Sequence, residues 1–94
     1  MVKATRIITK RTTRPNGSFT EIAIYEVPMP VRGSLHPYKY RMVYVVDGTC
    51  VLRYDNEAGK GDHKHVGAVE IPYSFIDMET LLRDFYKDVE RMEP

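Results

Sequence analysis

Residues 38–55, YKYRMVYVVDGTCVLRYD, decide the fold of this chain. Two runs of residues that favour β-strands flank Asp47-Gly48, and this dipeptide is among the strongest signals for a two-residue hairpin turn. We therefore expect a β-hairpin formed by the strands Tyr38–Val46 and Thr49–Asp55. Both strands are apolar near the turn and polar at the open end, so polar side chains should gather at that end.

The tight turn also predicts which side chains share a face of this hairpin. It places Tyr44 opposite Val51 and Met42 opposite Arg53. The resulting tyrosine-rich face comprises Tyr38, Tyr40, Met42, Tyr44 and Val51. We expect this face to belong to the core or to a dimer contact. Cys50, close to the turn, is predicted to be a small buried hydrophobic residue.

Another hairpin precedes this one in the sequence. Ala4–Arg11 is rich in Thr and Ile, and Phe19–Val27 alternates between two faces as a strand does. Between them, Arg14–Ser18 contains Asn-Gly, which readily takes the positive φ angles of tight turns. Pro28-Met29-Pro30 should end the second strand, because proline cannot donate to a ladder. Residues 31–37 are predicted to form a loop.

The apolar residues take up a helical period after Asp77. The apolar stripe comprises Met78, Leu81, Leu82, Phe85, Val89 and Met92. Asp77 is predicted to cap this helix at its N-terminus. Asn56–Gly67, in contrast, has two internal glycines and almost no apolar side chain, so we expect a loop there, with a short strand near His63–Val69.

These elements predict a single α+β domain over residues 1–94. Two antiparallel β-hairpins should form a four- to five-stranded sheet, packed against one C-terminal amphipathic helix. Small sheets often leave an edge or a face unpaired, so a homodimer through such a surface is a further expectation.

The charges are unevenly distributed along the chain. The net charge is only +1, but residues 1–20 contain five basic residues and no acid, whereas the C-terminal stretch is acidic. Either the basic sheet attracts a polyanion, or the sheet and the helix complement each other internally. One cysteine is compatible with a reducing compartment, and no apolar run approaches the roughly 20 residues of a membrane span. A soluble cytoplasmic protein without a membrane partner is therefore expected.

Side chains suited to catalysis are concentrated in residues 53–65, RYDNEAGKGDHKH, which contain two of the three histidines. His63 and His65 are two residues apart, so an extended backbone points both rings to the same side. Histidines at that spacing suit RNA cleavage through the 2′-hydroxyl, which needs a base, an acid and cations around the phosphate. The candidate catalytic residues are His63, His65, Asp55, Tyr54 and Asp62. The candidate substrate-binding residues are Arg53, Lys60, Lys64, Arg41, Lys39 and His36.

Two other interpretations of this cluster remain open. His63 and His65 would share a divalent metal ion if Asp55 supplied an oxygen ligand, although no third ligand stands at a diagnostic spacing. Alternatively, pairs such as Arg53 and Asp55 are exposed ion pairs of small energetic value, and the histidines are simply solvated.

The same cluster resembles a known family. Arg-Tyr-Asp-Asn at 53–56, followed by Gly-Lys-Gly-Asp-His-Lys-His-x-Gly at 59–67, is similar to the TumE-like family of small toxin proteins. Residues 27–30 and 34–41 agree with that resemblance, which covers about residues 5–92. It implies the toxin member of a toxin–antitoxin module, with a helix-turn-helix antitoxin encoded nearby as its partner. Many members have a longer insertion before the His-x-His pair than this sequence has.

Three functional hypotheses follow. The first is a toxin that acts on RNA as a metal-independent ribonuclease and needs no cofactor. The second is a non-catalytic module that binds a protein or a nucleic acid through the tyrosine-rich face or the acidic helix. The third is a metal-binding domain centred on His63, His65 and Asp55.

Overall fold

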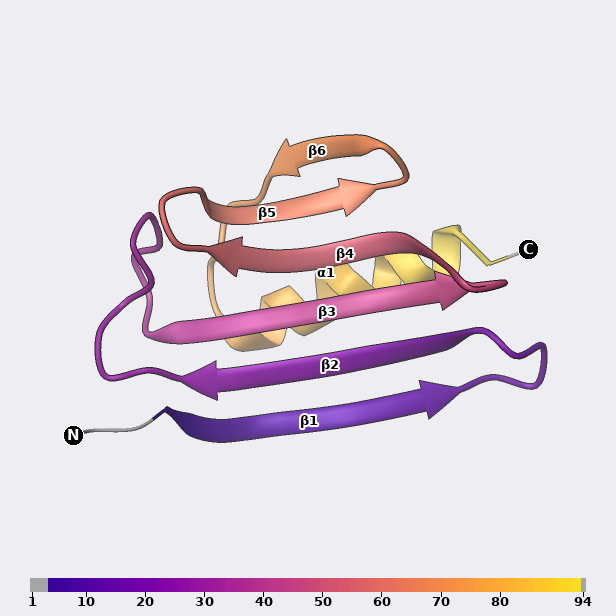
Figure 1. Cartoon of the computed structure of the whole chain (residues 1–94), viewed down its shortest axis with the longest axis horizontal. Helices are drawn as coiled ribbons and strands as arrows, with labels where there is room; N and C mark the ends of the chain where they lie inside the picture. The colour runs from indigo at the N-terminus through magenta and orange to yellow at the C-terminus, as the bar shows by residue number, and fades with distance from the viewer. Residues whose placement is uncertain (1–3, 94) are drawn as a thin grey trace.

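A six-stranded antiparallel sheet and one helix make up the fold. The computed structural model describes residues 4–93. The elements are β1 (Thr5–Thr13), β2 (Phe19–Glu26), β3 (Tyr38–Val46), β4 (Thr49–Glu57), β5 (Gly61–Val66), β6 (Val69–Pro72) and α1 (Met78–Arg91). The strands lie in chain order from β1 to β6, as Figure 1 shows. The predicted α+β class and C-terminal helix are confirmed, but the sheet has six strands rather than four or five.

β4 continues to Glu57 and β5 begins at Gly61, both inside the Asn56–Gly67 stretch that the sequence predicts as a loop. β5 overlaps the short strand predicted near His63–Val69, whereas β6, which follows that stretch and pairs with β5, is not predicted. The loop prediction is wrong because strands near a sheet edge need little apolar surface once backbone pairing with a neighbour is available. Asn56 even lies fully buried, since its side-chain amide bonds the backbone of β3 at Tyr38 O and Tyr40 N.

The central hairpin forms as predicted near its turn and differs further out. Asp47 and Gly48 have φ angles of 50° and 76°, as a tight hairpin turn requires. A register shift next to Val45 then places Tyr44 opposite Leu52 rather than Val51. A β-bulge of this kind turns every later side chain of β4 to the other face. Cys50 is exposed, so its predicted burial is also wrong.

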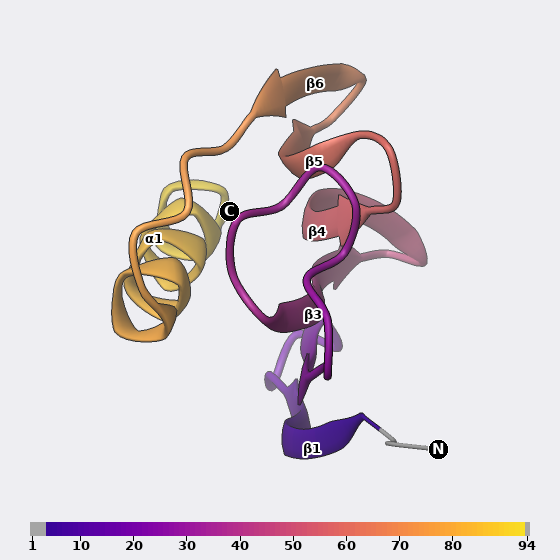
Figure 2. The same cartoon turned by 90° about the vertical axis from the view of Figure 1, so that its left-hand side faces the viewer.

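The core lies between α1 and one face of the sheet (Figure 2). The helix buries Leu81, Phe85 and Val89, which confirms the predicted stripe. The sheet contributes the buried side chains of Ile22, Ile24, Tyr40, Met42, Tyr44, Leu52 and Tyr54. The core interpretation of the tyrosine-rich face is therefore confirmed for its central residues.

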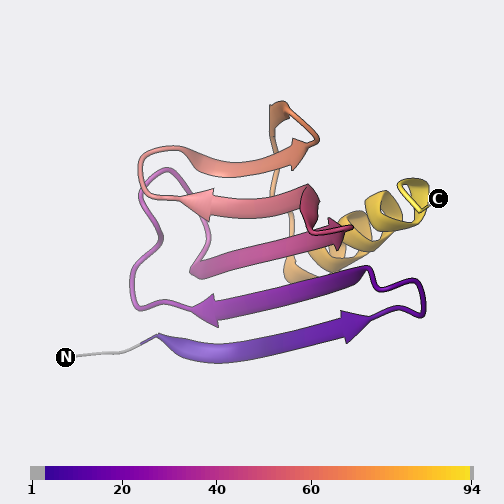
Figure 3. The ribbon, with the colours of Figure 1, turned by 45° about the vertical axis from the view of Figure 1, so that its right-hand side comes forward.

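The helix begins where the sequence predicts. Asp77 caps it, because one carboxylate oxygen accepts a hydrogen bond from the Thr80 N–H at 2.7 Å. Figure 3 shows that the β2–β3 connection and the β4–β5 turn meet at one end of the sheet. Within residues 4–93, no helix is long and apolar enough to cross a membrane.

Candidate functional site

The face of the sheet opposite α1, called the open face below, carries two rows of side chains that run across the strands. Pairing between neighbouring strands defines both rows. The first row comprises Thr9, Ala23, Arg41, Asp55, His63 and Pro72. The second row comprises Arg11, Glu21, Val43, Arg53, His65 and Glu70. Alternation places them there, because Tyr40, Met42 and Tyr44 point to the helix and their neighbours in β3 point away.

Arg53 links two of the predicted catalytic residues on the open face. Its terminal nitrogen lies 2.9 Å from His65 Nε2, and its Nε lies 3.3 Å from Asp55 Oδ2. A guanidinium only donates, so His65 Nε2 accepts this bond and the ring proton lies on Nδ1. The Nε contact is an ion pair without hydrogen-bond geometry, and this nitrogen has no hydrogen-bond partner among residues 4–93. Arg53 is thus held by charge and only partly by directional bonds.

His63 is oriented by two groups from its own hairpin. Its Nδ1 lies 2.8 Å from the Gly61 carbonyl oxygen, which only accepts, so Nδ1 carries a proton. Its Nε2 lies 3.2 Å from the Glu70 carboxylate, which also lies 3.8 Å from Lys60 Nζ. Nε2 is therefore the nitrogen of His63 that faces another side chain, and that side chain is the carboxylate of Glu70.

Asp62 and His36 lie on the helix side of the sheet, away from the His63 and His65 rings. The Asp62 carboxylate accepts hydrogen bonds from Ser34 Oγ at 2.6 Å, His36 Nε2 at 2.7 Å and the Tyr40 hydroxyl at 2.7 Å. His36 Nδ1 accepts the Tyr38 N–H at 3.2 Å, so both ring nitrogens are engaged. Burial, followed by the bond to Asp62, raises the pKa of Tyr40 far above its ordinary value. This network fastens the β2–β3 loop to β5.

Tyr54 and Lys64 also point to the helix side. The Tyr54 hydroxyl donates to Asp88 at 2.5 Å, and Lys64 Nζ lies 3.0 Å from the same carboxylate oxygen. Burial, with the bond to Asp88 as the next cause, raises the pKa of Tyr54 well above its ordinary value. These two residues connect the sheet to α1, and the structure does not bring them together with His63 and His65.

The remaining predicted residues lie around the open face. Lys39 Nζ donates to the Asn56 carbonyl oxygen. Arg41 is exposed and makes no ion pair within the described part of the chain. Glu70 was missed by the sequence reasoning because β6 was not predicted. The signal was present, since Gly67-Ala68 lies midway between His65 and Glu70 and makes them cross-strand partners.

The structure offers no donor set for the metal hypothesis in residues 4–93. No group of three or more His, Cys, Asp or Glu side chains there is arranged to hold a metal ion. Asp55 and His65 both turn to Arg53, and a guanidinium between two potential ligands opposes a bound cation.

Comparison with known proteins identifies the family of this chain. The family model described as Toxin TumE matches residues 2–93, nearly the whole chain. No curated protein and no solved structure matches it. Membership of a toxin family indicates a toxin-like role for this chain, with an antitoxin as its partner. The resemblance noted in residues 53–67 is thereby confirmed, and the chain belongs to the TumE toxin family.

Proposed function

We propose that this member of the TumE family acts on RNA as a metal-independent ribonuclease whose chemistry occurs on the open face. The observation that supports this most is the grouping of Arg53, Asp55, His63 and His65 on neighbouring strands, on one face. Two histidines and a guanidinium supply the proton acceptor, the proton donor and the positive charge that RNA cleavage needs. Action on RNA would place the protein in the cytoplasm.

His63 is the base in this proposal. The Gly61 carbonyl holds the proton on Nδ1, which leaves Nε2 to take the proton of a ribose 2′-hydroxyl. The 2′-oxygen then attacks the adjacent phosphorus. The Glu70 carboxylate, 3.2 Å from Nε2, stabilises the imidazolium that forms. Glu70 is thus a positioning residue that acts through His63.

His65 is the acid, and Arg53 stabilises the charge of the phosphorane. The two histidines lie about 6.6 Å apart along β5, so their rings can flank one phosphate. A bound phosphate competes for the Arg53 guanidinium, which leaves His65 Nε2 able to bind a proton. His65 passes that proton to the 5′-oxygen as the phosphorus–oxygen bond breaks. The products are a 2′,3′-cyclic phosphate and a 5′-hydroxyl.

The experiment compares the wild type with the His63→Ala, His65→Ala double variant on a labelled RNA pool, with and without EDTA. The proposal predicts EDTA-resistant cleavage that falls by about 10²-fold or more in the double variant. Lys87→Gln is the matched control, because Lys87 lies on the exposed side of α1 and has no place in the mechanism. A thermal melt of each protein shows whether it is folded.

Two other outcomes of this experiment would contradict the proposal. EDTA-sensitive cleavage would contradict the metal-free mechanism and favour the metal hypothesis. Absence of cleavage by a folded wild type, over several RNAs, would contradict the ribonuclease proposal as a whole.

A non-catalytic interaction module is the second candidate, and one observation favours it. Leu35 and Ile76 are largely exposed apolar residues beside a cavity of about 520 Å³ at the loop end of the molecule. Exposed apolar groups around a cavity suit a protein partner. A helix-turn-helix antitoxin encoded nearby is the partner we propose. Leu35→Ser with Ile76→Ser would weaken its binding without changing RNA cleavage.

Homodimer formation is a further part of the proposal. β1 forms an edge of the sheet and pairs only with β2 within residues 4–93. An unpaired edge can add a strand from a second copy. Sedimentation at several protein concentrations measures this, and a monomer throughout would contradict it.

A further inference from the structure

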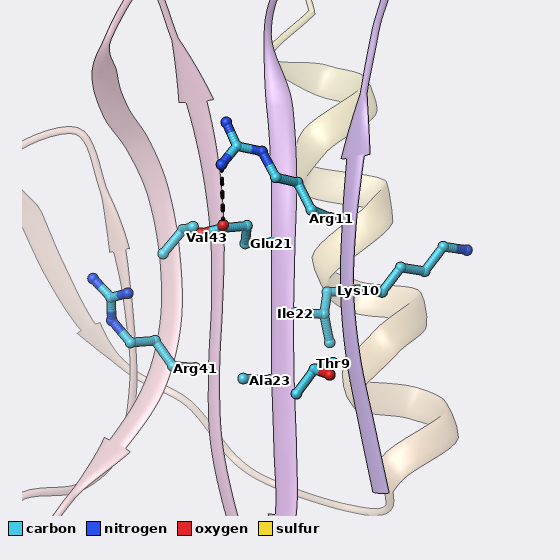
Figure 4. A pocket seen from close by; sticks show the side chains of 8 residues that line it. All are labelled: Thr9, Lys10, Arg11, Glu21, Ile22, Ala23, Arg41 and Val43. Carbon is cyan, nitrogen blue, oxygen red and sulfur yellow. Dashed lines mark hydrogen bonds and ion pairs between the residues drawn. The ribbon is translucent and has the colours of Figure 1, made fainter. Parts of the chain in front are cut away.

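A depression lies on the open face over β1, β2 and β3, away from the histidines. Its volume is about 390 Å³. It is lined by Thr9, Lys10, Arg11, Glu21, Ile22, Ala23, Arg41 and Val43 (Figure 4). Ala23 lies between Thr9 and Arg41 in the first row of the open face, and its methyl group leaves space that larger neighbours do not fill.

The charged side chains around this depression favour an anion. Figure 4 shows Arg11 joined to Glu21, whereas Arg41 stands apart from both. The Arg11–Glu21 contact measures 3.4 Å between two half-exposed side chains, so it is weak and easily exchanged. Lys10 points away from these arginines in the figure and does not share their side. Two guanidinium groups therefore border a small floor formed by Ala23 and Val43.

The depression and the histidines belong to one continuous surface. The first row leads from Ala23 through Arg41 and Asp55 to His63, one residue on each successive strand. Three strand spacings amount to about 14 Å. A ligand that reaches both places must be extended and must cross the strands, as a short oligonucleotide does and a mononucleotide does not.

We propose that this depression is a subsite for a nucleotide farther along the RNA, beyond the dinucleotide that is bound at His63 and His65. Arg41 and Arg11 donate to its phosphate, and the nucleotide's apolar surface lies against Ala23 and Val43. The RNA occupant rests on the proposed function. An acidic segment of a protein partner is the other occupant that the test must separate.

The test measures binding of two labelled probes by fluorescence anisotropy. The probes are a dinucleotide and a hexanucleotide with 2′-O-methyl groups throughout, which cannot be cleaved through the 2′-hydroxyl. Arg41→Gln should weaken hexanucleotide binding by roughly 10-fold and lower its salt slope by about 1, without changing dinucleotide binding. Ala23→Leu, which fills the depression without changing charge, should weaken hexanucleotide binding as well. Lys87→Gln on the exposed side of α1 removes one positive charge outside the depression, so it is the matched control and should leave hexanucleotide binding within about twofold.

The alternative results have distinct meanings. Unchanged hexanucleotide binding in Ala23→Leu and Arg41→Gln would overturn the subsite. An equal loss in Lys87→Gln would overturn it as well, because it would indicate diffuse attraction by charge. Absence of hexanucleotide binding by the wild type would overturn it too. A separate assay measures cleavage of the same RNAs without the methyl groups. Normal cleavage of the unmethylated dinucleotide, with either binding result, leaves the proposed function standing. Selective binding of the methylated hexanucleotide without cleavage of the unmethylated RNAs would contradict the ribonuclease and retain the subsite.

Discussion

The carboxylate of Asp62 connects three side chains at one end of the molecule. It accepts hydrogen bonds from Ser34 and His36, which belong to the β2–β3 loop, and from Tyr40 on β3, the next strand but one from β5 in the sheet. A buried carboxylate is costly unless it is paired with donors, and here three donors surround it. We infer that Asp62 and His36 serve the fold, and that the chemistry belongs to the histidines on the other face.

Removal of one of these donors should destabilise the protein without touching the open face. Tyr40→Phe keeps the ring in the core and deletes the hydroxyl that donates to Asp62 at 2.7 Å. We expect the free energy of unfolding to fall by about 1–3 kcal/mol, because a hydrogen bond to a buried charge is lost. Urea denaturation measures this change.

Tyr25→Phe is the control for that variant. Tyr25 is only half-buried, so its change should stay within about 0.5 kcal/mol. Equal effects of the two substitutions would show that the Asp62 network does not stabilise the loop.

For single residues, the sequence predicts correctly which side chains share a face, because the spacing along a strand decides this. His63 and His65 lie on one face of β5, as two residues at that separation must in a strand. Asp62 and Lys64 fall on the other face for the same reason, which separates them from the histidines. The candidate catalytic residues all lie in one stretch of sequence, and only the knowledge that this stretch forms strands assigns them to two faces.

The helix is the element that the sequence predicted best. Its apolar stripe and its cap are both local patterns, and the sheet provides only the surface that they pack against. The sequence predicts β5 only as a short strand near His63–Val69 and does not predict β6. β5 pairs with β4 and β6 pairs with β5 across short turns, but the mostly polar side chains of β5 give no alternating apolar pattern.

The cap of α1 should make stability depend on pH in acid. The backbone N–H of Thr80, which donates to Asp77, lowers the pKa of that carboxyl below its ordinary value of 3.8. A lowered pKa stabilises the folded state above the unfolded value, and this stabilisation is lost as the pH falls through the folded value. Asp77→Ala should therefore lower Tm by a few degrees at pH 7, and the difference should shrink below about pH 4.

Thermal melts from pH 2.5 to 7 measure this dependence. Glu90→Gln, near the other end of α1, is the control and should show no such convergence. A difference between wild type and Asp77→Ala that stays constant over the whole range would contradict the capping role of the carboxylate.

The β-bulge in the central hairpin matters for the site as well as for the fold. Without it, Arg53 would lie opposite Met42 and point to the core, as the tight-turn register predicts. With it, Arg53 lies opposite Val43 and reaches the open face beside His65. One irregular position, which no local sequence pattern predicts, therefore decides on which face of the sheet this guanidinium lies.

In the whole molecule, part of the basic charge is balanced inside the fold and part is left exposed. Lys64 pairs with Asp88, and Arg14 pairs with Glu93, so part of the basic charge is balanced inside the fold. Arg41 remains exposed on the open face, which no other element covers within residues 4–93 (Figure 2). An uncovered sheet face with cations beside a histidine pair suits a polyanionic substrate.

The central claim is that the open face cleaves RNA through its own 2′-hydroxyl, with His63 as the base. The most direct measurement maps the cuts in a labelled oligoribonucleotide in EDTA, then repeats the assay with 2′-deoxyribose placed before each cut. The account predicts products ending in a 2′,3′-cyclic phosphate, loss of cleavage at every deoxy position, and a loss of about 10²- to 10⁴-fold in His63→Gln. Cuts that persist at the deoxy positions, or in His63→Gln, would contradict it.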